Sequence, residues 1–160
     1  MGTNREKRAK TASNRPFAGA LSDADYVALA SWRYALRRFL SASETITRAA
    51  GVSPTQYQLL LFVRGSERGA PSIADLAECL QIQHQSAVGL IDRCVAAGLV
   101  RRRRDPVNRR RVLVSTTARG TNLLRRLAAD HFATIESLGE AFLPPAPSRG
   151  RERKRRDIGS

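Results

Sequence analysis

The residues with the clearest chemistry form a run of arginines at 101–111, which reads RRRRDPVNRRR. Apolar segments precede and follow this run, at 96–100 and 112–114. The central Asp-Pro-Val-Asn is typical of a turn, because proline presets φ and Asp or Asn caps the turn through its side chain. We therefore predict two short strands joined by a tight turn, an arginine-coated hairpin that contacts polyphosphate.

A second set of polar candidates lies just before this hairpin, in a segment with helical spacing. Its predicted buried face carries Ala87, Leu90, Ile91, Cys94 and Val95. A helix turns about 100° per residue, so the remaining positions share the opposite face. Glutamine is suited to adenine and arginine to guanine in the major groove, so this face is predicted to read bases. The candidates are His84, Gln85, Ser86, Gly89 and Arg93.

Two of these positions keep alternatives open. Gly89 either allows a close approach of DNA or reflects drift at an exposed site, at a cost of about 1 kcal/mol relative to alanine in a helix. His84 either contacts bases or is a solvated residue at the helix start.

Helical patterns elsewhere must position these groups. Ser22 is predicted to cap a helix that ends at Gly51, and this helix is long for so small a domain. Its apolar stripe suggests a partner subunit. Ser53 and Ser72 are predicted to cap two shorter helices, the second ending before a break at 81–83. A last helix is predicted to begin at Thr116 or Thr117 and to stop at Pro144-Pro145.

The charge is unevenly distributed. The formal net charge is +14, and the excess lies in 1–17, 101–111 and 144–160, while basic and acidic residues balance elsewhere. We expect an anionic partner, most often nucleic acid. The expected organisation is a flexible basic arm over 1–20, one domain over 21–143 and a basic disordered tail over 144–160. The first 17 residues lack the apolar centre of a signal peptide and no stretch has transmembrane length, so a cytoplasmic protein without a membrane partner is expected.

Helix-turn-helix followed by a hairpin is a known DNA-reading arrangement, and the chain resembles the MarR-type winged helix-turn-helix regulators of bacteria. The resemblance covers roughly 22–143. It implies a mainly α fold with a small β wing (α+β), and a homodimer formed by the terminal helices, 22–50 and 117–143. The segments that carry it are 53–57, 73–77, 87–93, 97–102, 105–111 and 113–117, with Gly120 in the family's Thr-x-x-Gly.

The family's function is then expected here. The resemblance implies a sequence-specific regulator, most commonly a repressor, that binds a pseudo-palindromic site in double-stranded DNA and is released by a small aromatic or carboxylate-type effector. No cofactor and no metal are expected. Candidate residues for the effector pocket are Trp32, Tyr34, Arg37, Phe39 and Tyr57, although aromatic residues at helical spacing are more often core.

In the wing, alternation along a strand lets only about half of the arginines at 101–104 face DNA. We expect Arg101 and Arg103 to do so, and Arg109 and Arg110 to enter the minor groove, where narrow A·T tracts attract guanidinium groups. The resemblance implies that Asp105 orders the turn and pairs with Arg109.

Three features depart from the family pattern. Asn108 replaces a second aspartate in the wing turn, and its loss of charge is expected to loosen the salt bridge at the tip. Gln83 stands where Ser or Thr normally caps the recognition helix. The chain also has one terminal helix where the family usually has two.

Other functions are less well supported. His84 and His131 stand at unrelated positions, His131 on an apolar stripe as a core or interface residue, and no glycine-rich phosphate loop or Cys/His cluster occurs, so an enzyme is not expected. The main alternative is a non-specific architectural nucleic-acid-binding protein. Another is a redox-sensing regulator of the same fold that uses Cys79 or Cys94, although small core residues or reduced thiols are the simpler interpretation.

Overall fold

The computed structural model describes residues 20–67 and 69–146. The predicted basic arm and basic tail therefore lie almost entirely outside the described residues. None of the helices within these ranges is long and apolar enough to cross a membrane. The elements are α1 (Asp23–Ala49), α2 (Pro54–Gly65), α3 (Ile73–Leu80), α4 (His84–Ala96), β1 (Val100–Arg104), β2 (Val112–Thr116), α5 (Ala118–Leu138) and the 3-10 helix η1 (Gly139–Phe142).

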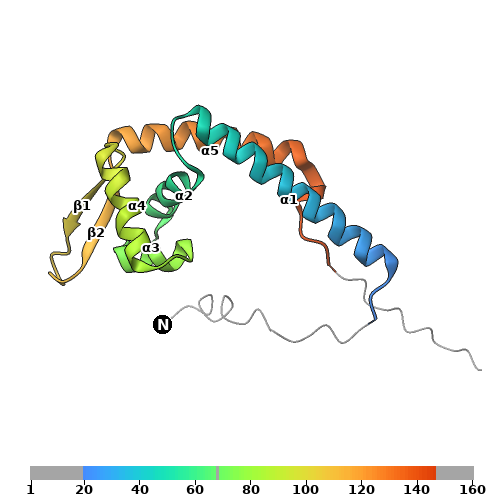
Figure 1. Cartoon of the computed structure of the whole chain (residues 1–160), viewed down its shortest axis with the longest axis horizontal. Coiled ribbons are helices and arrows are strands. Elements are labelled where there is room, and N and C mark those ends of the chain that lie inside the picture. The colour runs from blue at the N-terminus through green and yellow to red at the C-terminus, as the bar shows by residue number, and fades with distance from the viewer. Residues whose placement is uncertain (1–19, 68, 147–160) are drawn as a thin grey trace, which may run out of the picture.

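The elements form two parts, which we call the head and the arm. The head contains α2, α3, α4 and the antiparallel pair β1–β2, and the arm consists of the long helices α1 and α5, which lie side by side and extend away from the head (Figure 1). This arrangement confirms the predicted mainly helical fold with a two-stranded wing.

Local capping explains where the helices begin. The predicted caps of α1, α2 and α3 each form a capping box, in which a serine hydroxyl accepts from a backbone N–H three residues on and that residue's side chain accepts from the serine N–H. Helix α4 differs, because its N-cap residue Gln83 makes no side-chain capping hydrogen bond. The three pairs are Ser22–Asp25, Ser53–Gln56 and Ser72–Asp75.

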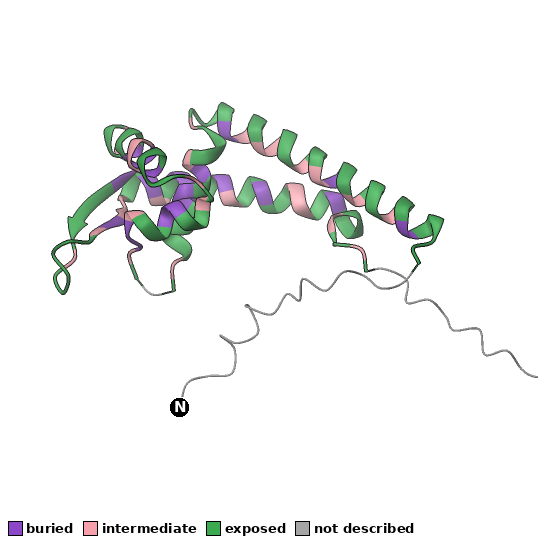
Figure 2. Ribbon diagram, turned by 60° about the horizontal axis from the view of Figure 1, so that its bottom comes forward, coloured by how far each residue is buried: buried purple, intermediate pink, exposed green. Residues whose placement is uncertain are grey.

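The core joins the head to one end of the arm. Buried apolar side chains come from every element of the head and from α5, as the purple segments of Figure 2 show. Burial of each large aliphatic side chain contributes about 1.5–3 kcal/mol. Among the most deeply buried are Leu59, Leu60, Leu76, Ile91, Val114 and Leu127.

The start of α5 packs against the end of the segment between α4 and β1. The Thr117 backbone N–H donates to the Leu99 carbonyl at 3.0 Å, and the Thr117 hydroxyl donates to the Gly98 carbonyl at 2.6 Å. Gly120 lies directly against the same chain: a Cβ there would overlap the Leu99 carbonyl oxygen and lie 2.9 Å from its carbon. Glycine is therefore required at this crossing for steric reasons.

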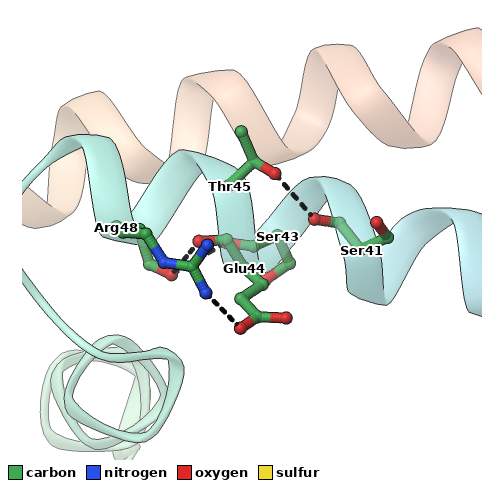
Figure 3. Close-up of polar contacts among 6 residues, drawn as sticks. Ser41, Ser43, Glu44, Thr45 and Arg48 are labelled. Atoms are coloured by element: carbon green, nitrogen blue, oxygen red, sulfur yellow. Dashed lines mark hydrogen bonds and ion pairs between the residues drawn. The ribbon is translucent and has the colours of Figure 1, made fainter.

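Polar side chains of the second half of α1 satisfy one another along the helix (Figure 3). Glu44 and Arg48 pair at 2.6 Å, and the Thr45 hydroxyl donates to the Ser41 carbonyl at 3.1 Å. These groups are exposed, so the pair contributes only about 0.3–0.5 kcal/mol. Other side chains of α1 make its contacts with α5.

Two local predictions were wrong. Val95 is 40% exposed, because it lies about 100° around α4 from Cys94 and outside the buried stripe. Helix α5 ends at Leu138, before the prolines, because Gly139 adopts φ +55°. The chain continues as η1, which places the ring of Phe142 5.1 Å from that of Phe39.

Candidate nucleic-acid interface

The predicted base-reading residues share one face of α4. Its opposite face is buried through Ala87, Leu90, Ile91 and Cys94, each no more than 2% exposed. The four predicted residues with side chains that can contact bases or phosphate are exposed, and Gly89 is half-buried between them. The exposed members are His84, Gln85, Ser86 and Arg93.

The surroundings of Gly89 bear on its two interpretations. A Cβ at this position would meet only the Arg93 Nη1 atom, at an ordinary 3.7 Å. Contacts among the described residues therefore do not require glycine here, in contrast to Gly120.

Sequence reasoning missed an acid on the same face. The side chain of Asp92 is 56% exposed and pairs with Arg102 of β1 at 2.5 Å. The Arg102 guanidinium also donates to the Val88 carbonyl at 3.2 Å. The helical angle gave a signal, since Asp92 stands seven residues, or two turns, from Gln85. Its partner on another element could not be deduced from spacing.

The wing has the predicted alternation. Strands β1 and β2 pair with Arg101 opposite Ser115 and Arg103 opposite Leu113, so these arginines lie on the face opposite to Arg102. The Arg101 Nε atom donates to the Ser115 hydroxyl at 3.2 Å. Arg103 lines a groove of about 690 Å³ between the wing, α2 and α3. All four arginines of β1 are exposed.

The loop at the wing tip is longer than the predicted tight turn. Residues 109–111 belong to this loop and not to the second strand, which starts at Val112. The Asp105 N–H donates to the Arg111 carbonyl at 3.0 Å, and the Arg111 N–H donates to the Asn108 carbonyl at 2.8 Å. These two bonds close the loop that carries Arg109 and Arg110, the arginines that we expect to contact DNA.

The Asp105 carboxylate orders this loop through the backbone. One oxygen accepts from the N–H groups of Val107 at 2.9 Å and Asn108 at 3.3 Å, which holds the pKa of Asp105 below its ordinary value, with help from the nearby charges of Arg111 and Arg103. The expected pairing with Arg109 is wrong.

Among the described residues, the ion pairs of the head are Arg102–Asp92 and Arg111–Asp75, and neither contains Asp105 or Arg109. Asn108 provides a further bond in place of the family's acid, since its Oδ1 accepts from the Arg110 N–H at 3.2 Å. The tip is therefore held by backbone hydrogen bonds and does not depend on the salt bridge that Asn108 was expected to loosen.

Asp75 ties the wing loop to α3. Its carboxylate accepts from the Ser72 N–H and hydroxyl, each at 2.8 Å, and from Arg111 at 3.0 Å. The backbone bond from Ser72 is the largest cause of the lowered pKa of Asp75, and Arg111 adds to it.

A cavity of about 360 Å³ lies between α1, α2 and α5, at the junction of arm and head. Two of the five predicted pocket residues, Phe39 and Tyr57, line it, and Trp32, Tyr34 and Arg37 do not. Tyr34 is 66% exposed on another face of α1. The remaining lining residues are Leu40, Ser43, Gln58, Leu61, Ala128, His131, Phe132 and Ile135.

His131 is one of the cavity residues that sequence reasoning did not assign to it. It is 4% exposed, as its core interpretation predicts, and its ring stacks on Tyr57 with centroids 4.2 Å apart. Its Nδ1 lies 2.6 Å from the Leu127 carbonyl, and its Nε2 lies 2.8 Å from the Ser43 hydroxyl. A carbonyl only accepts, so Nδ1 carries a hydrogen and donates it to Leu127, while Nε2 and the Ser43 hydroxyl share the second hydrogen bond. Burial raises the pKa of Tyr57, so its phenol stays protonated beside this ring.

The two thiols have different environments. Cys94 is buried in the head and its pKa is raised by burial, whereas Cys79 is exposed and borders the groove beside the wing. In the described part of the chain, no group of three or more His, Cys, Asp or Glu residues could hold a metal ion.

Comparisons with known proteins agree with this geometry. Residues 50–111 match the family model of the MarR family. Comparison with curated proteins gives no match. Among solved structures, AbsC of Streptomyces coelicolor, a MarR family transcriptional regulator, is 23% identical with a TM-score of 0.64, covering 80% of this chain and 86% of its own.

Two further structures extend the likeness. A MarR family transcription regulator is 26% identical with a TM-score of 0.64, covering 76% of this chain and 79% of its own. A variant of MepR from Staphylococcus aureus, solved bound to an oligodeoxyribonucleotide, is 17% identical with a TM-score of 0.60. The match covers 71% of this chain and 80% of the MepR chain. The matched segment covers α2, α3, α4, β1 and the wing loop, and over this part the chain is similar to MarR family regulators. The solved structures share its fold.

Proposed function

We propose that this chain is a MarR-type DNA-binding transcriptional regulator, a homodimeric repressor that binds a pseudo-palindromic operator. We propose that a small aromatic or carboxylate-type effector releases it. The observation that carries the proposal is the exposed face of α4, which presents Gln85, Ser86 and Arg93 beside an arginine-rich wing. As a regulator of bacterial DNA, it would act in the cytoplasm.

The two parts of the interface have different tasks. Gln85 and Arg93 on α4 would read base edges in the major groove, because their side chains match the hydrogen-bonding groups of adenine and guanine. Arg109 and Arg110, exposed on the wing loop, would enter the minor groove. The wing would therefore supply affinity, and α4 would supply sequence preference. The remaining proposed contacts are His84, Ser86, Gly89, Arg101 and Arg103.

The exposed apolar side chains of the arm support the proposal of a homodimer. Several large apolar side chains of α1 and α5 remain 58–66% exposed, more than a solvated helix pair needs. A second copy would cover them and place two recognition helices about 34 Å apart, one turn of DNA. That spacing would match a pseudo-palindrome. The exposed residues are Tyr26, Val27, Tyr34, Leu40 and Phe132.

The cavity at the junction supports an effector site. Its volume of about 360 Å³ suits a small molecule. The walls are largely apolar, and polar groups are provided by Ser43, Gln58 and the His131 ring. A ligand there would contact α1 and α5 of the arm and α2 of the head together, so it could change the angle between them.

The test is a binding assay at one stated salt concentration, with a pseudo-palindrome from the gene's own upstream region and a random duplex of equal length. We expect much tighter binding to the first. Arg109→Ala and Arg110→Ala should weaken binding to both, whereas Gln85→Ala or Arg93→Ala should relax the preference between them. Equal affinity of the unaltered protein for both duplexes would instead favour a non-specific architectural protein.

The effector is tested with the same complex. Candidate aromatic acids are titrated into it, and a true effector should weaken the shift of the operator. Phe132→Ala serves as the cavity variant and Tyr34→Ala as the matched aromatic control outside the cavity. If both variants respond like the unaltered protein, the cavity is not the effector site.

A further inference from the structure

We infer that two of the seven wing arginines, Arg102 and Arg111, are positioning residues that fix the wing against α4 and α3 through Asp92 and Asp75. They would orient the wing and would not bind phosphate. This inference rests on the proposed DNA-binding role of the wing. The wing arginines that we propose to contact DNA are Arg101, Arg103, Arg109 and Arg110.

Arg102 makes two contacts with the recognition helix. Its guanidinium pairs with Asp92 at 2.5 Å and donates to the Val88 carbonyl at 3.2 Å, one turn earlier on α4. Its side chain is 31% exposed, and the fork geometry of arginine lets one group make both bonds. The contact therefore fixes both the distance and the angle between β1 and α4.

Arg111 provides the equivalent contact on the other side of the wing. It pairs at 3.0 Å with Asp75, whose carboxylate is already fixed by the Ser72 N–H and hydroxyl in the capping box of α3. The position of the Asp75 carboxylate is thus fixed independently of Arg111. The wing loop is joined in this way to the first helix of the helix-turn-helix.

Main-chain contacts join β2 to the segment that precedes α3. The Val114 N–H of β2 donates to the Pro71 carbonyl at 2.9 Å, and Leu113 forms a bridge with Ser72. In the described residues, the polar side-chain contact between β1 and the helices is that of Arg102. The two ion pairs therefore add to the β1–β2 pairing in fixing the angle of β1 and of the loop against the helices.

Charge supports the same assignment. Asp92 lies on the exposed face of α4, where an uncompensated carboxylate would repel DNA phosphates. Arg102 neutralises it. A guanidinium already paired with an acid releases fewer counterions from DNA than one that binds a phosphate. The two kinds of arginine are thus distinguishable by the salt dependence of binding.

The experiment uses two charge-neutral double variants, Asp92→Asn with Arg102→Gln and Asp75→Asn with Arg111→Gln, and Arg110→Gln as the matched control. Binding to one duplex is measured over a series of salt concentrations. Arg110→Gln should reduce the slope of log affinity against log salt by about 0.9 per protomer. The double variants should weaken binding about two- to five-fold per protomer with an unchanged slope. A loss of slope equal to that of Arg110→Gln would overturn the inference.

The single variants add a second readout. Arg102→Gln leaves Asp92 unpaired near DNA, so it should bind more weakly than the double variant, and Asp92→Asn should partly rescue it. Additive effects of the two changes would contradict the pairing.

Amide hydrogen exchange of the DNA-free protein separates failure of this inference from failure of the proposed function. The double variants should increase exchange of the wing amides at Asp105 and Arg111, and Arg110→Gln should not. Unchanged exchange in the double variants would reject the positioning role whether or not the protein binds an operator.

Discussion

Gly120→Ala tests the crossing between α5 and the segment before β1. The new Cβ would overlap the Leu99 carbonyl oxygen, and that atom belongs to the backbone and cannot rotate away. Helix α5 would have to move outward. The movement would stretch the Thr117 bonds to Leu99 and Gly98, which are 3.0 and 2.6 Å long.

The cost follows from these contacts. Two hydrogen bonds contribute about 1 kcal/mol each, and overpacking costs about 2 kcal/mol. Replacing a helical glycine with alanine returns roughly 1 kcal/mol through helix propensity. The free energy of unfolding should therefore fall by about 3 kcal/mol, which lowers the urea midpoint by about 1.5 M for a typical slope near 2 kcal/mol per M.

Gly89→Ala is the matched control, because its Cβ meets only Arg93 at 3.7 Å. It should raise the free energy of unfolding by up to about 1 kcal/mol. Urea unfolding is followed by circular dichroism at one protein concentration, since association would shift the midpoint. A Gly120→Ala protein as stable as wild type would refute the steric reasoning. A stabilised Gly89→Ala protein that binds DNA more weakly would show that glycine there serves close approach to DNA.

Two further predictions concern titration and thiol reactivity. The pKa of Asp75 is lowered in the folded state, so its stabilising effect is present above its ordinary pKa of 3.8 and is lost as the pH falls further. Asp75→Asn should therefore be less stable than wild type at pH 7, and the gap in urea midpoint should narrow as the pH falls from 5 to about 3; a constant gap would contradict this. Cys79 should react rapidly with an aromatic disulfide reagent in the native protein, and Cys94, which is fully buried, should react only on unfolding. If the rapid reaction persists in Cys79→Ser and disappears in Cys94→Ser, Cys94 becomes a candidate redox sensor.

The features predicted correctly from the sequence are those set by local chemistry. Ser22, Ser53 and Ser72 cap their helices through bonds to residues three positions away, so each signal lies within one turn. The wing followed from apolar flanks and turn residues in the same way. The exposed face of α4 followed from helical periodicity alone.

The features that were missed depend on contacts between distant segments. The Ser43–His131 bond joins residues 88 positions apart, and Asp92 meets Arg102 only after the chain has turned into β1. Gly139 was overlooked because prolines give a stronger stop signal, although a positive φ ends the helix five residues earlier. The resemblance implied that Arg109 pairs with Asp105. In the structure the Asp105 carboxylate instead accepts hydrogen bonds from backbone N–H groups of its own loop.

The length of the arm has a mechanical consequence. Helix α1 has 27 residues, or about 40 Å at 1.5 Å per residue, and the cavity containing His131 lies where the arm meets the head. Over such a lever, a tilt of about 5° at the cavity displaces the opposite end by about 3.5 Å. One base-pair step of DNA is about 3.4 Å. In the proposed homodimer, a side-chain rearrangement at the junction would thus shift the far end of each arm by about one base-pair step relative to a head that stays on its half-site.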